Sequence, residues 1–326
     1  MKILSVFLFL LTFSFGDTVV KIASYNVENL FDLEKSDYRY KEYQPYSESL
    51  WNKKHYKIKL QNIARVIKDL NADIIALQEI GSLKALKDLR KEIKKLGLYY
   101  KHFSIANKKR TVIKVALLSK IPFVYTKELP VSSGYKFRNI LEAKFRIESH
   151  ELYLLVNHWK AKSGPESMRI VSAKKLRKRV VEIGEEKNII LLGDFNSDYE
   201  EHLKFKRSRR HNDTEGKTGI NHVLKTLEGA SHQFYNLWYD TTKELRYSYI
   251  YKRKKETLDH IIISPSLREE KDAYYVYNSF GSFKKPYLFK GKKINRWEIS
   301  RGRVQKHKGK GYSDHLPVSA KFLFRS

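Results

Sequence analysis

Residues 188–196 read Asn-Ile-Ile-Leu-Leu-Gly-Asp-Phe-Asn, an apolar run that ends in two polar side chains. Such a run, closed by a glycine that lets the backbone turn, predicts a buried strand ending at Gly193. Asp194 and Asn196 lie two residues apart, so on an extended stretch both side chains point the same way. One could polarise an attacking water molecule while the other holds it. The alternative is an Asx-type turn followed by a helix cap.

Further polar signatures follow apolar runs elsewhere in the chain. They are Ser24-Tyr25-Asn26, Leu77-Gln78-Glu79, Asn157-His158 and Ser313-Asp314-His315. Each is weak alone, because a polar residue at the end of a strand is more often a turn former or a solvated charge. In this order they predict one active site, assembled from separate strand ends, for metal-assisted cleavage of a phosphate ester.

The residue types suit that chemistry. Magnesium prefers oxygen ligands, so Glu79 is a candidate metal ligand, and Asn26 could add a carbonyl oxygen. In Asp314-His315 the carboxylate could serve the metal or the water, and the imidazole could act as a base or stabilise charge. His158 is a second imidazole that could share the proton transfers.

Asp259 heads an isoleucine-rich stretch. A carboxylate buried there would be costly unless it were paired, and a histidine partner would offset the cost while fixing its own tautomer. The alternative reading of any single histidine is a structural or surface role.

The periodicity predicts alternating strands and helices. Strands are expected at 19–27, 73–77, 112–118, 138–147, 151–156, 188–192 and 316–324, and helices at 53–70, 83–96 and 166–183. Residues 246–251 and 257–263 could form a hairpin across Lys252-Arg253-Lys254-Lys255. Helices between strands indicate two packed sheets with helices outside, in one α/β domain over residues 17–326. Long basic loops are expected near 203–217 and 283–310.

The first residues predict export. Lys2, the apolar run from Ile3 to Phe15, and Ser14-Phe15-Gly16 fit a signal peptide over residues 1–16, and the run is too short for a membrane span of about 20 residues. We therefore expect a periplasmic or secreted monomer without stable membrane insertion. Cysteine is absent, which excludes disulfides, thiolate metal sites and cysteine nucleophiles.

The motifs resemble those of the endonuclease/exonuclease/phosphatase superfamily, the DNase I-like proteins, over almost the whole mature chain. The matching segments are Ser24-Tyr25-Asn26-Val27-Glu28-Asn29, Leu77-Gln78-Glu79, Val156-Asn157-His158-Trp159-Lys160, Gly193-Asp194-Phe195-Asn196, Leu258-Asp259-His260-Ile261 and Ser313-Asp314-His315-Leu316-Pro317-Val318. The run around His158 is most similar to bacterial secreted nucleases of this superfamily.

That resemblance implies a four-layer αββα sandwich of two mixed sheets flanked by helices. It implies a divalent-metal site at Glu79, Asn26 and Asp314, with Mg²⁺ as the cofactor and Mn²⁺ or Ca²⁺ able to substitute or assist.

It also implies roles for the other site residues. Asp194 and Asn196 would align or activate water, Asp259 would orient His315 as base or phosphate-binding group, and His158 would protonate the leaving oxygen. Two departures from the family pattern are the missing disulfides and Lys114-Val115, where many members have glycine. The second departure bears on the expected phosphate contacts from Arg110 or Arg138.

The substrate class is inferred from charge. The chain holds 65 Lys and Arg against 36 Asp and Glu, a net charge of +29, which attracts polyanions. Eleven of these cations lie between Phe283 and Gly311, interleaved with aromatic rings and directly before Asp314.

We therefore expect a nuclease of little sequence preference, acting on DNA and possibly RNA. The proposed substrate contacts are Lys160, Lys306, Lys308 and Lys310, with Arg110 and Arg138. The alternatives are a sphingomyelinase-like or other lipid phosphodiesterase, and a non-catalytic cationic protein that binds polyanions.

Overall fold

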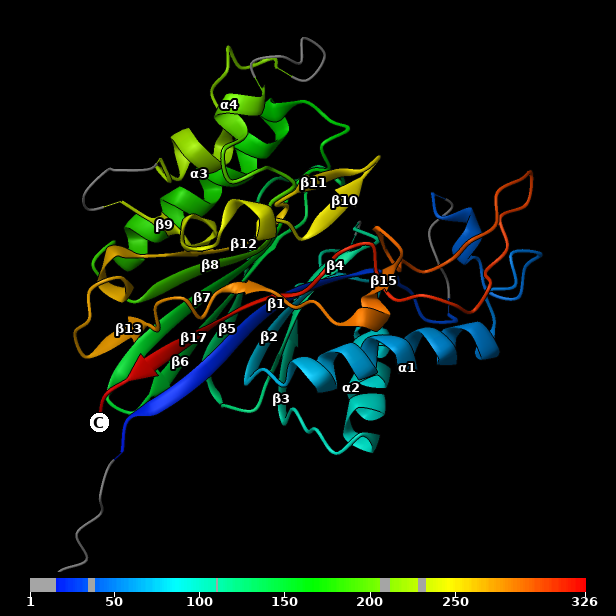
Figure 1. Ribbon diagram of the computed structural model, residues 1–326, viewed down its shortest axis with the longest axis horizontal. Helices are drawn as coiled ribbons and strands as arrows, with labels where there is room; N and C mark the ends of the chain where they lie inside the picture. Colours follow the sequence, from blue (N-terminus) through cyan, green and yellow to red (C-terminus); the bar gives the residue numbers. More distant parts are fainter. Residues whose placement is uncertain (1–15, 35–38, 110, 206–211, 228–232) are drawn as a thin grey trace, which may run out of the picture.

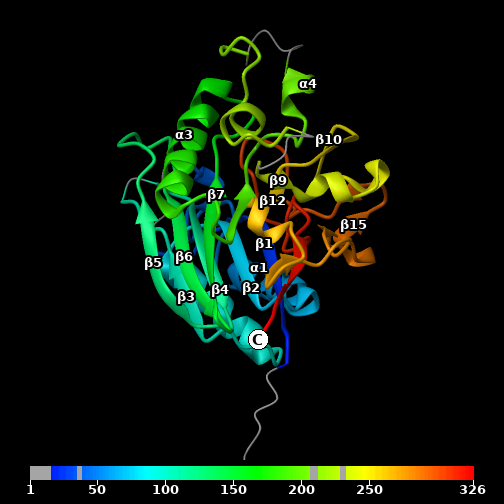
Figure 2. The ribbon, with the colours of Figure 1, turned by 90° about the vertical axis from the view of Figure 1, so that its left-hand side faces the viewer.

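The computed structural model describes the chain except for residues 1–15, 35–38, 110, 206–211 and 228–232. Two large sheets lie face to face at its centre (Figures 1 and 2). The expected signal peptide lies outside the described residues except for Gly16. In the described part of the chain, no helix combines the length and the apolarity that a bilayer crossing requires.

The first sheet brings together the two ends of the described chain. Its strands, in spatial order, are β13 (Ala273–Tyr275), β17 (Val318–Phe324), β1 (Thr18–Leu30), β2 (Ile74–Ile80), β4 (Lys114–Ser119) and β3 (His102–Ile105). A further strand, β14 (Gly281–Ser282), pairs with β17. β1 runs parallel to β2 and antiparallel to β17, so the sheet is mixed.

The second sheet comes from the middle of the chain. Its strands, in spatial order, are β5 (Phe123–Leu129), β6 (Ile140–Ile147), β7 (His150–His158), β8 (Ile189–Asp194), β12 (Asp259–Ile263) and β9 (Tyr235–Asn236). β7 and β8 are parallel, and β12 runs antiparallel to β8.

Alternation along the strands creates the layers. On β8, Ile190 and Leu192 pack in the core between the sheets, whereas Ile189 and Leu191 pack against the helix that follows β7. This explains why residues 189–192 are all apolar: the strand is buried on both faces.

Helices cover both outer faces (Figure 2). α1 (Lys53–Leu70) and α2 (Leu83–Lys95) cover the first sheet, and α3 (Glu166–Ile183) covers the second. α1 begins where Asn52 accepts hydrogen bonds from the N–H groups of Lys54 and His55, at 3.0 and 3.2 Å. The observed order helix–sheet–sheet–helix confirms the predicted four-layer sandwich.

Short helical segments and two small hairpins complete the described fold. The helical segments are α4 (Glu201–Phe205), five 3₁₀ turns (Lys41–Tyr43, Leu237–Asp240, Lys243–Leu245, Pro265–Leu267, Pro286–Leu288) and a π turn (Gly219–Val223). The hairpins are β10 (Tyr249–Tyr251) with β11 (Lys254–Glu256), and β15 (Phe289–Lys290) with β16 (Lys293–Ile294).

The expected hairpin between 246–251 and 257–263 is wrong. Lys252 and Arg253 both have positive φ, 46° and 70°, and close a two-residue turn, so β10 pairs with β11. The strand that begins at Asp259 instead joins β8 in the second sheet.

Candidate active site

Seven of the predicted site residues meet at one edge of the sandwich because the chain directions bring them there. Parallel strands end at the same edge, so β1 and β2 deliver Asn26 and Glu79, while β7 and β8 deliver His158 and Asp194. β12 is antiparallel to β8, so its first residue, Asp259, reaches the same edge. The loop before β17 adds Asp314 and His315.

Asp194 is at the centre of this group and is 2 % exposed. Asn26 Nδ2 donates to its Oδ2 at 3.0 Å, and the N–H of Asn196 donates to its Oδ1 at 2.8 Å. His158 Nε2 and His315 Nε2 lie 3.5 and 4.0 Å from Oδ2. Burial raises the pKa of Asp194 to about 7, even though the His315 imidazolium lowers it.

His315 is held by Asp259. Its Nδ1 lies 2.7 Å from Asp259 Oδ2, so this nitrogen carries the proton and Nε2 faces the site. The attraction of Asp259 and Asp194 outweighs desolvation and keeps the pKa of His315 well above its usual value. Near neutral pH His315 is therefore a cation, suited to bind phosphate or donate a proton.

His158 has the opposite protonation state. Burial, and then repulsion from Arg138 and His315, lowers its pKa well below the usual value, so the ring is neutral near pH 7. Its Nε2 lies 3.8 Å from Glu79 Oε1, and its buried Nδ1 has no hydrogen-bond partner in the described part of the chain. A neutral imidazole favours a proton-accepting role over the donor role expected from the sequence.

Glu79 lies in β2 where the pairing with both neighbouring strands is irregular, and its backbone is strained. Its φ is +65°, and the N–H of Asn29 donates to its Oε2 at 2.8 Å, leaving Oε1 toward His158. Burial raises the pKa of Glu79, and Asp314 raises it further. Two carboxylates that repel each other in a largely buried site form an environment in which a divalent cation is stabilising.

Gly193 is required where β7 and β8 approach each other. Its φ is +133°, and a Cβ atom there would lie 2.0 Å from the carbonyl oxygen of Asn157. Any other residue would push apart the two strands that carry His158 and Asp194. The glycine that marks the sequence motif is thus a packing requirement of the site.

A charge cluster beside the site, in which Glu28 and Lys59 are buried and Arg296 is exposed, was not foreseen from the sequence. Arg296 donates to Glu28 Oε1, through Nε at 2.9 Å and also through Nη2, and its Nη2 lies 3.3 Å from Asp314 Oδ2. Lys59, fully buried on α1, donates to the carbonyl of Glu28. Burial raises the pKa of Glu28 to about 7 and lowers that of Lys59 to about 8.

The predicted substrate contacts are dispersed. Arg110 lies outside the described residues. Arg138 is near the site and donates to the carbonyl of Trp159 at 2.8 Å. Lys160 directly follows Trp159 in the chain. Lys306, Lys308 and Lys310 are exposed, at the end of the 283–310 loop.

Oxygen donors suited to a hard cation are present at the predicted positions Glu79, Asn26 and Asp314. A second possibility is the trio Asp194, Asp259 and His315, whose ligand atoms lie within 4.8 Å of one another. In that trio His315 Nδ1 is already hydrogen-bonded to Asp259 Oδ2. We therefore favour the Glu79 side, where His158 Nε2 is 3.8 Å from Glu79 and His315 Nε2 is 4.0 Å from Asp314, both beyond hydrogen-bond distance.

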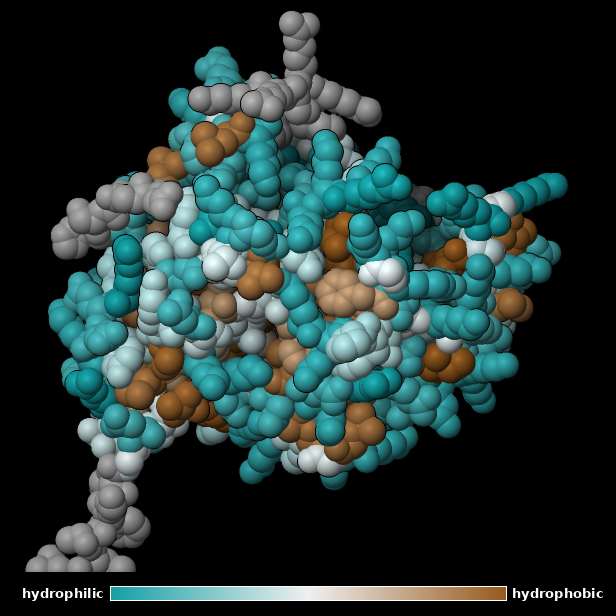
Figure 3. Space-filling view, in the orientation of Figure 1, coloured by the Kyte–Doolittle hydropathy of each residue, from teal (hydrophilic) through white to brown (hydrophobic). Residues whose placement is uncertain are grey.

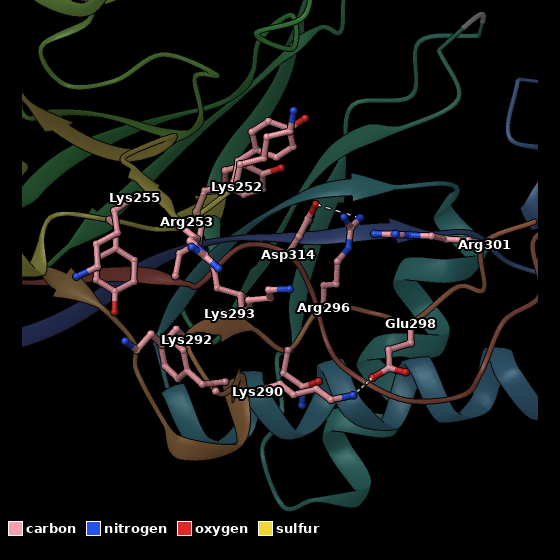
Figure 4. A pocket seen from close by; sticks show the side chains of 18 residues that line it. Lys252, Arg253, Lys255, Lys290, Lys292, Lys293, Arg296, Glu298, Arg301 and Asp314 are labelled. Carbon is pink, nitrogen blue, oxygen red and sulfur yellow. Dashed lines mark hydrogen bonds and ion pairs between the residues drawn. The ribbon is translucent and has the colours of Figure 1, made fainter.

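Outside this edge lies a cleft of about 1570 Å³ between the β10–β11 and β15–β16 hairpins, which we call the hairpin cleft. Figure 4 shows Lys252 and Arg253 on one side of it, Lys292 and Lys293 on the other, and Asp314 beyond them. Eight of its lining residues are Lys or Arg, against Glu298 and Asp314. None of Lys306, Lys308 and Lys310 lines it.

Comparisons with known proteins agree with the fold. A sequence model described as "Endonuclease/Exonuclease/phosphatase family" matches residues 21–323. A family protein from Bacteroides thetaiotaomicron has a similar structure, with TM-score 0.59 and 16 % identity, covering 96 % of this chain and 100 % of that one. A comparison with curated proteins gives no match.

Two further solved structures are similar in fold. TDP2 of D. rerio, complexed with a single-strand DNA product, has TM-score 0.60 and 14 % identity, covering 94 % of this chain and 99 % of that one. A mannosyl-6-phosphatase of Bacteroides thetaiotaomicron has TM-score 0.58 and 16 % identity, covering 94 % and 100 %.

Proposed function

Because the chain belongs to the endonuclease/exonuclease/phosphatase family, we propose that it is an exported, Mg²⁺-dependent nuclease that hydrolyses nucleic acid with little sequence preference. The observation that carries the proposal is the pairing of Asp194 with two histidines in opposite protonation states. His158 Nε2 and His315 Nε2 lie 3.5 and 4.0 Å from the same carboxylate oxygen. The site thus holds a proton acceptor and a proton donor together.

The residues divide the chemistry between them. A buried Asp194 whose pKa is about 7 is matched to accept a proton from attacking water near neutral pH. Asn26 and the backbone of Asn196 fix its two oxygens. The His315 cation, held by Asp259, would bind a phosphoryl oxygen or protonate the leaving group.

His158 would accept a hydrogen bond from water or substrate while staying neutral. A divalent cation at Glu79, Asn26 and Asp314 would neutralise charge on the reacting phosphate. This chemistry suits phosphodiesters and phosphomonoesters alike, so the choice of substrate depends on the surface around the site.

Charge supports nucleic acid as the substrate. The chain has a net charge of +29, and the hairpin cleft beside the site has an excess of cations. A polyanion gains from such a surface through release of its counterions. TDP2 of D. rerio shows that this fold can hold a DNA product.

The alternative of a lipid phosphodiesterase is supported less well. A hairpin that docks on a membrane carries apolar residues at its tip, whereas the β10–β11 turn carries Lys252 and Arg253, both exposed. On the face seen in Figure 3, hydrophobic residues form separate patches among hydrophilic ones.

Circular plasmid provides the direct test. We expect the purified protein to nick it in the presence of Mg²⁺ and not in the presence of a chelator, which would also identify endonuclease action because a circle has no ends. Sphingomyelin vesicles and a sugar phosphate serve as competing substrates. Turnover of either one without any cleavage of DNA or RNA would contradict a nuclease.

Export and the monomeric state are further proposals. Sequencing the N-terminus of protein recovered from outside the cytoplasm should find cleavage near Gly16. Light scattering at several concentrations should give a single mass near that of one chain. A retained N-terminus, or a mass that doubles with concentration, would contradict the respective proposal.

A further inference from the structure

We infer that the hairpin cleft binds an unpaired strand of nucleic acid, so that the enzyme prefers single-stranded over duplex substrate. The inference rests on the proposed function, because it names the form of polymer that the same active site receives. It depends on the size of the cleft, its charge, its accessible rings and its connection to the catalytic residues.

Size argues for a polymer. Pockets for small ligands span about 300–1,000 Å³. The hairpin cleft is larger, at about 1570 Å³. With eight cations against two carboxylates in its lining, it is suited to a chain of phosphates.

The close approach of the two hairpins argues against a duplex. Cα atoms of β10 and β16 come within 8 Å of one another, so the two hairpins are in contact. The major groove of B-form DNA is by itself about 12 Å wide, so a double helix is too broad to pass between the hairpins where they are in contact. A single strand can be accommodated.

Two of the aromatic rings that line the cleft are already engaged. Tyr247 has the ammonium groups of Lys255 and Lys284 within 4.5 and 4.2 Å of its ring centroid. Tyr249 packs against the His315 ring, with centroids 4.9 Å apart. These contacts cover part of each ring, and Tyr247 is buried as well.

Tyr251 and Phe289 are the other two rings, one from each hairpin, and the Lys252 ammonium lies 5.5 Å from the Tyr251 ring centroid. Tyr251 is 54 % exposed, and Phe289 is half-buried. Both line the cleft. An aromatic ring can stack on a base only when the base is free of its partner strand, and this stacking tolerates any sequence. The two rings thus favour an unpaired strand and explain how binding can occur without base-specific contacts.

The cleft leads to the reacting centre. Arg296 and Asp314 both line it, and they form an ion pair of 3.3 Å at its inner end (Figure 4). Tyr249 connects the cleft to the site as well, because its ring contacts His315. A strand lying between the hairpins would therefore pass its backbone beside His315.

The test measures binding separately from hydrolysis. A labelled single-stranded oligonucleotide and the duplex of the same length are titrated with the full-length protein in chelator, using fluorescence anisotropy. We expect the dissociation constant for the single strand to be at least tenfold lower. Equal affinity, or a preference for the duplex, would overturn the inference.

Ring variants make the test specific. Tyr251→Leu and Phe289→Leu keep apolar bulk but remove the stacking surface, and each should weaken single-strand binding about fivefold or more. Duplex binding should change little. Tyr277→Leu, at a tyrosine that is 65 % exposed outside the cleft, is the matched control and should bind normally. Unchanged single-strand affinity in both cleft variants would overturn the inference.

Failure of the proposed function would look different. If the protein prefers single strands in chelator but hydrolyses no nucleic acid with any divalent metal, the inference stands and the nuclease proposal falls. If it hydrolyses DNA but binds duplex better, only the inference falls. Tighter binding to vesicles containing phosphatidylglycerol than to the oligonucleotide would also overturn it, because the cleft would then be a membrane surface.

Discussion

Asp194 and Asp259 lie directly opposite each other in the antiparallel pair of β8 and β12. Both carboxylates are buried, and like charges at directly opposed positions of a sheet are destabilising. His315 supplies the compensating cation, 2.7 Å from one carboxylate and 4.0 Å from the other. One imidazolium thus serves two acids, which leaves an imbalance: burial first, and then repulsion by Asp259, raises the pKa of Asp194 to about 7.

This imbalance predicts that Asp194 reduces stability near neutral pH. A raised pKa means that the native state binds the proton more tightly than the unfolded state does. The free energy of unfolding, measured in chelator, should therefore fall as pH rises from 3.8 to about 7.

Asp194→Asn should remove that slope and keep stability at pH 7 equal to or about 1–2 kcal/mol above wild type, because a buried charge is lost. Turnover should fall at least about a thousandfold. Chemical unfolding at several pH values and plasmid nicking check the two effects. Glu186→Gln, at an exposed loop position, should change neither. An active Asp194→Asn enzyme would exclude Asp194 from the reaction.

The Asp259–His315 bond predicts the alkaline limb of the pH–rate profile. Asp259 raises the pKa of His315, so the cation that the reaction needs is lost only at alkaline pH. Asp259→Asn should move that limb down by about one pH unit or more, because an adjacent opposite charge shifts a pKa by about 1–3 units.

The measurement is kcat/KM against pH for both proteins on the same substrate. A purely structural role for Asp259 would lower the rate equally at every pH and leave the limb in place. His315→Ala should abolish turnover while leaving nucleic-acid binding nearly intact, and His158→Ala should behave in the same way.

Much of the fold could be predicted because local patterns determine it. α1 and α3 occupy the residues expected from apolar periodicity, 53–70 and 166–183. The strand expected at 188–192 is equally evident and is observed at Ile189–Asp194, since the apolar run 189–192 reflects burial on both faces. The short strands β13 to β16 carry no such signal, because two or three residues cannot establish a period.

The site was predictable as a set of residues but not as a set of contacts. Motif ends identified Asp194 and Asp259, yet their direct opposition depends on register between strands far apart in sequence. Arg296 was one of eleven cations in a basic stretch, and only folding singles it out against Glu28 and Asp314. Its position in the chain does not distinguish Arg296 from the other ten Lys and Arg residues of that stretch.

The third prediction concerns Lys59, the buried lysine on α1, and how it anchors the 283–310 loop. Lys59 is fully buried, donates to the carbonyl of Glu28, and lies 5.1 Å from the Trp297 ring centroid. Lys59→Met should cost about 3 kcal/mol of stability, because it leaves the buried Glu28 less compensated.

When Glu28→Gln is added, the double variant should lose less free energy of unfolding than the two single variants lose together, as expected for charges that compensate each other. Lys57→Met, at an exposed position of the same helix, is the control and should stay within about 0.5 kcal/mol of wild type. Additive losses measured by urea unfolding would show that the two groups are not coupled.

Metal binding should stabilise the protein through Glu79. A ligand that binds only the native state adds RT ln(1 + [L]/Kd), so Mg²⁺ should raise the melting temperature, and the rise should grow with concentration. Glu79→Gln should abolish most of this increase, and Glu186→Gln should not. If Asp259→Asn rather than Glu79→Gln removed it, the ion would belong with the trio of Asp194, Asp259 and His315.

The last prediction concerns which cations hold the polymer. Lys252→Gln, Lys292→Gln and Lys293→Gln together, the cleft-lysine variant, remove three exposed cations that line the hairpin cleft. Binding of a single strand should weaken, and the slope of log K against log salt should become shallower. The expected change is about 0.7 for each phosphate that the protein no longer neutralises, or about 2 in all.

The matched comparison is the loop-lysine variant, with Lys306→Gln, Lys308→Gln and Lys310→Gln. It removes the same charge from exposed positions that do not line the cleft. The sequence leads us to expect some loss of affinity here too, because overall attraction falls, but the cleft-lysine variant should show the greater loss and the greater change in slope. Titrations at several salt concentrations decide between them. A larger effect in the loop-lysine variant would mean that the strand crosses the end of the 283–310 loop and bypasses the space between the hairpins.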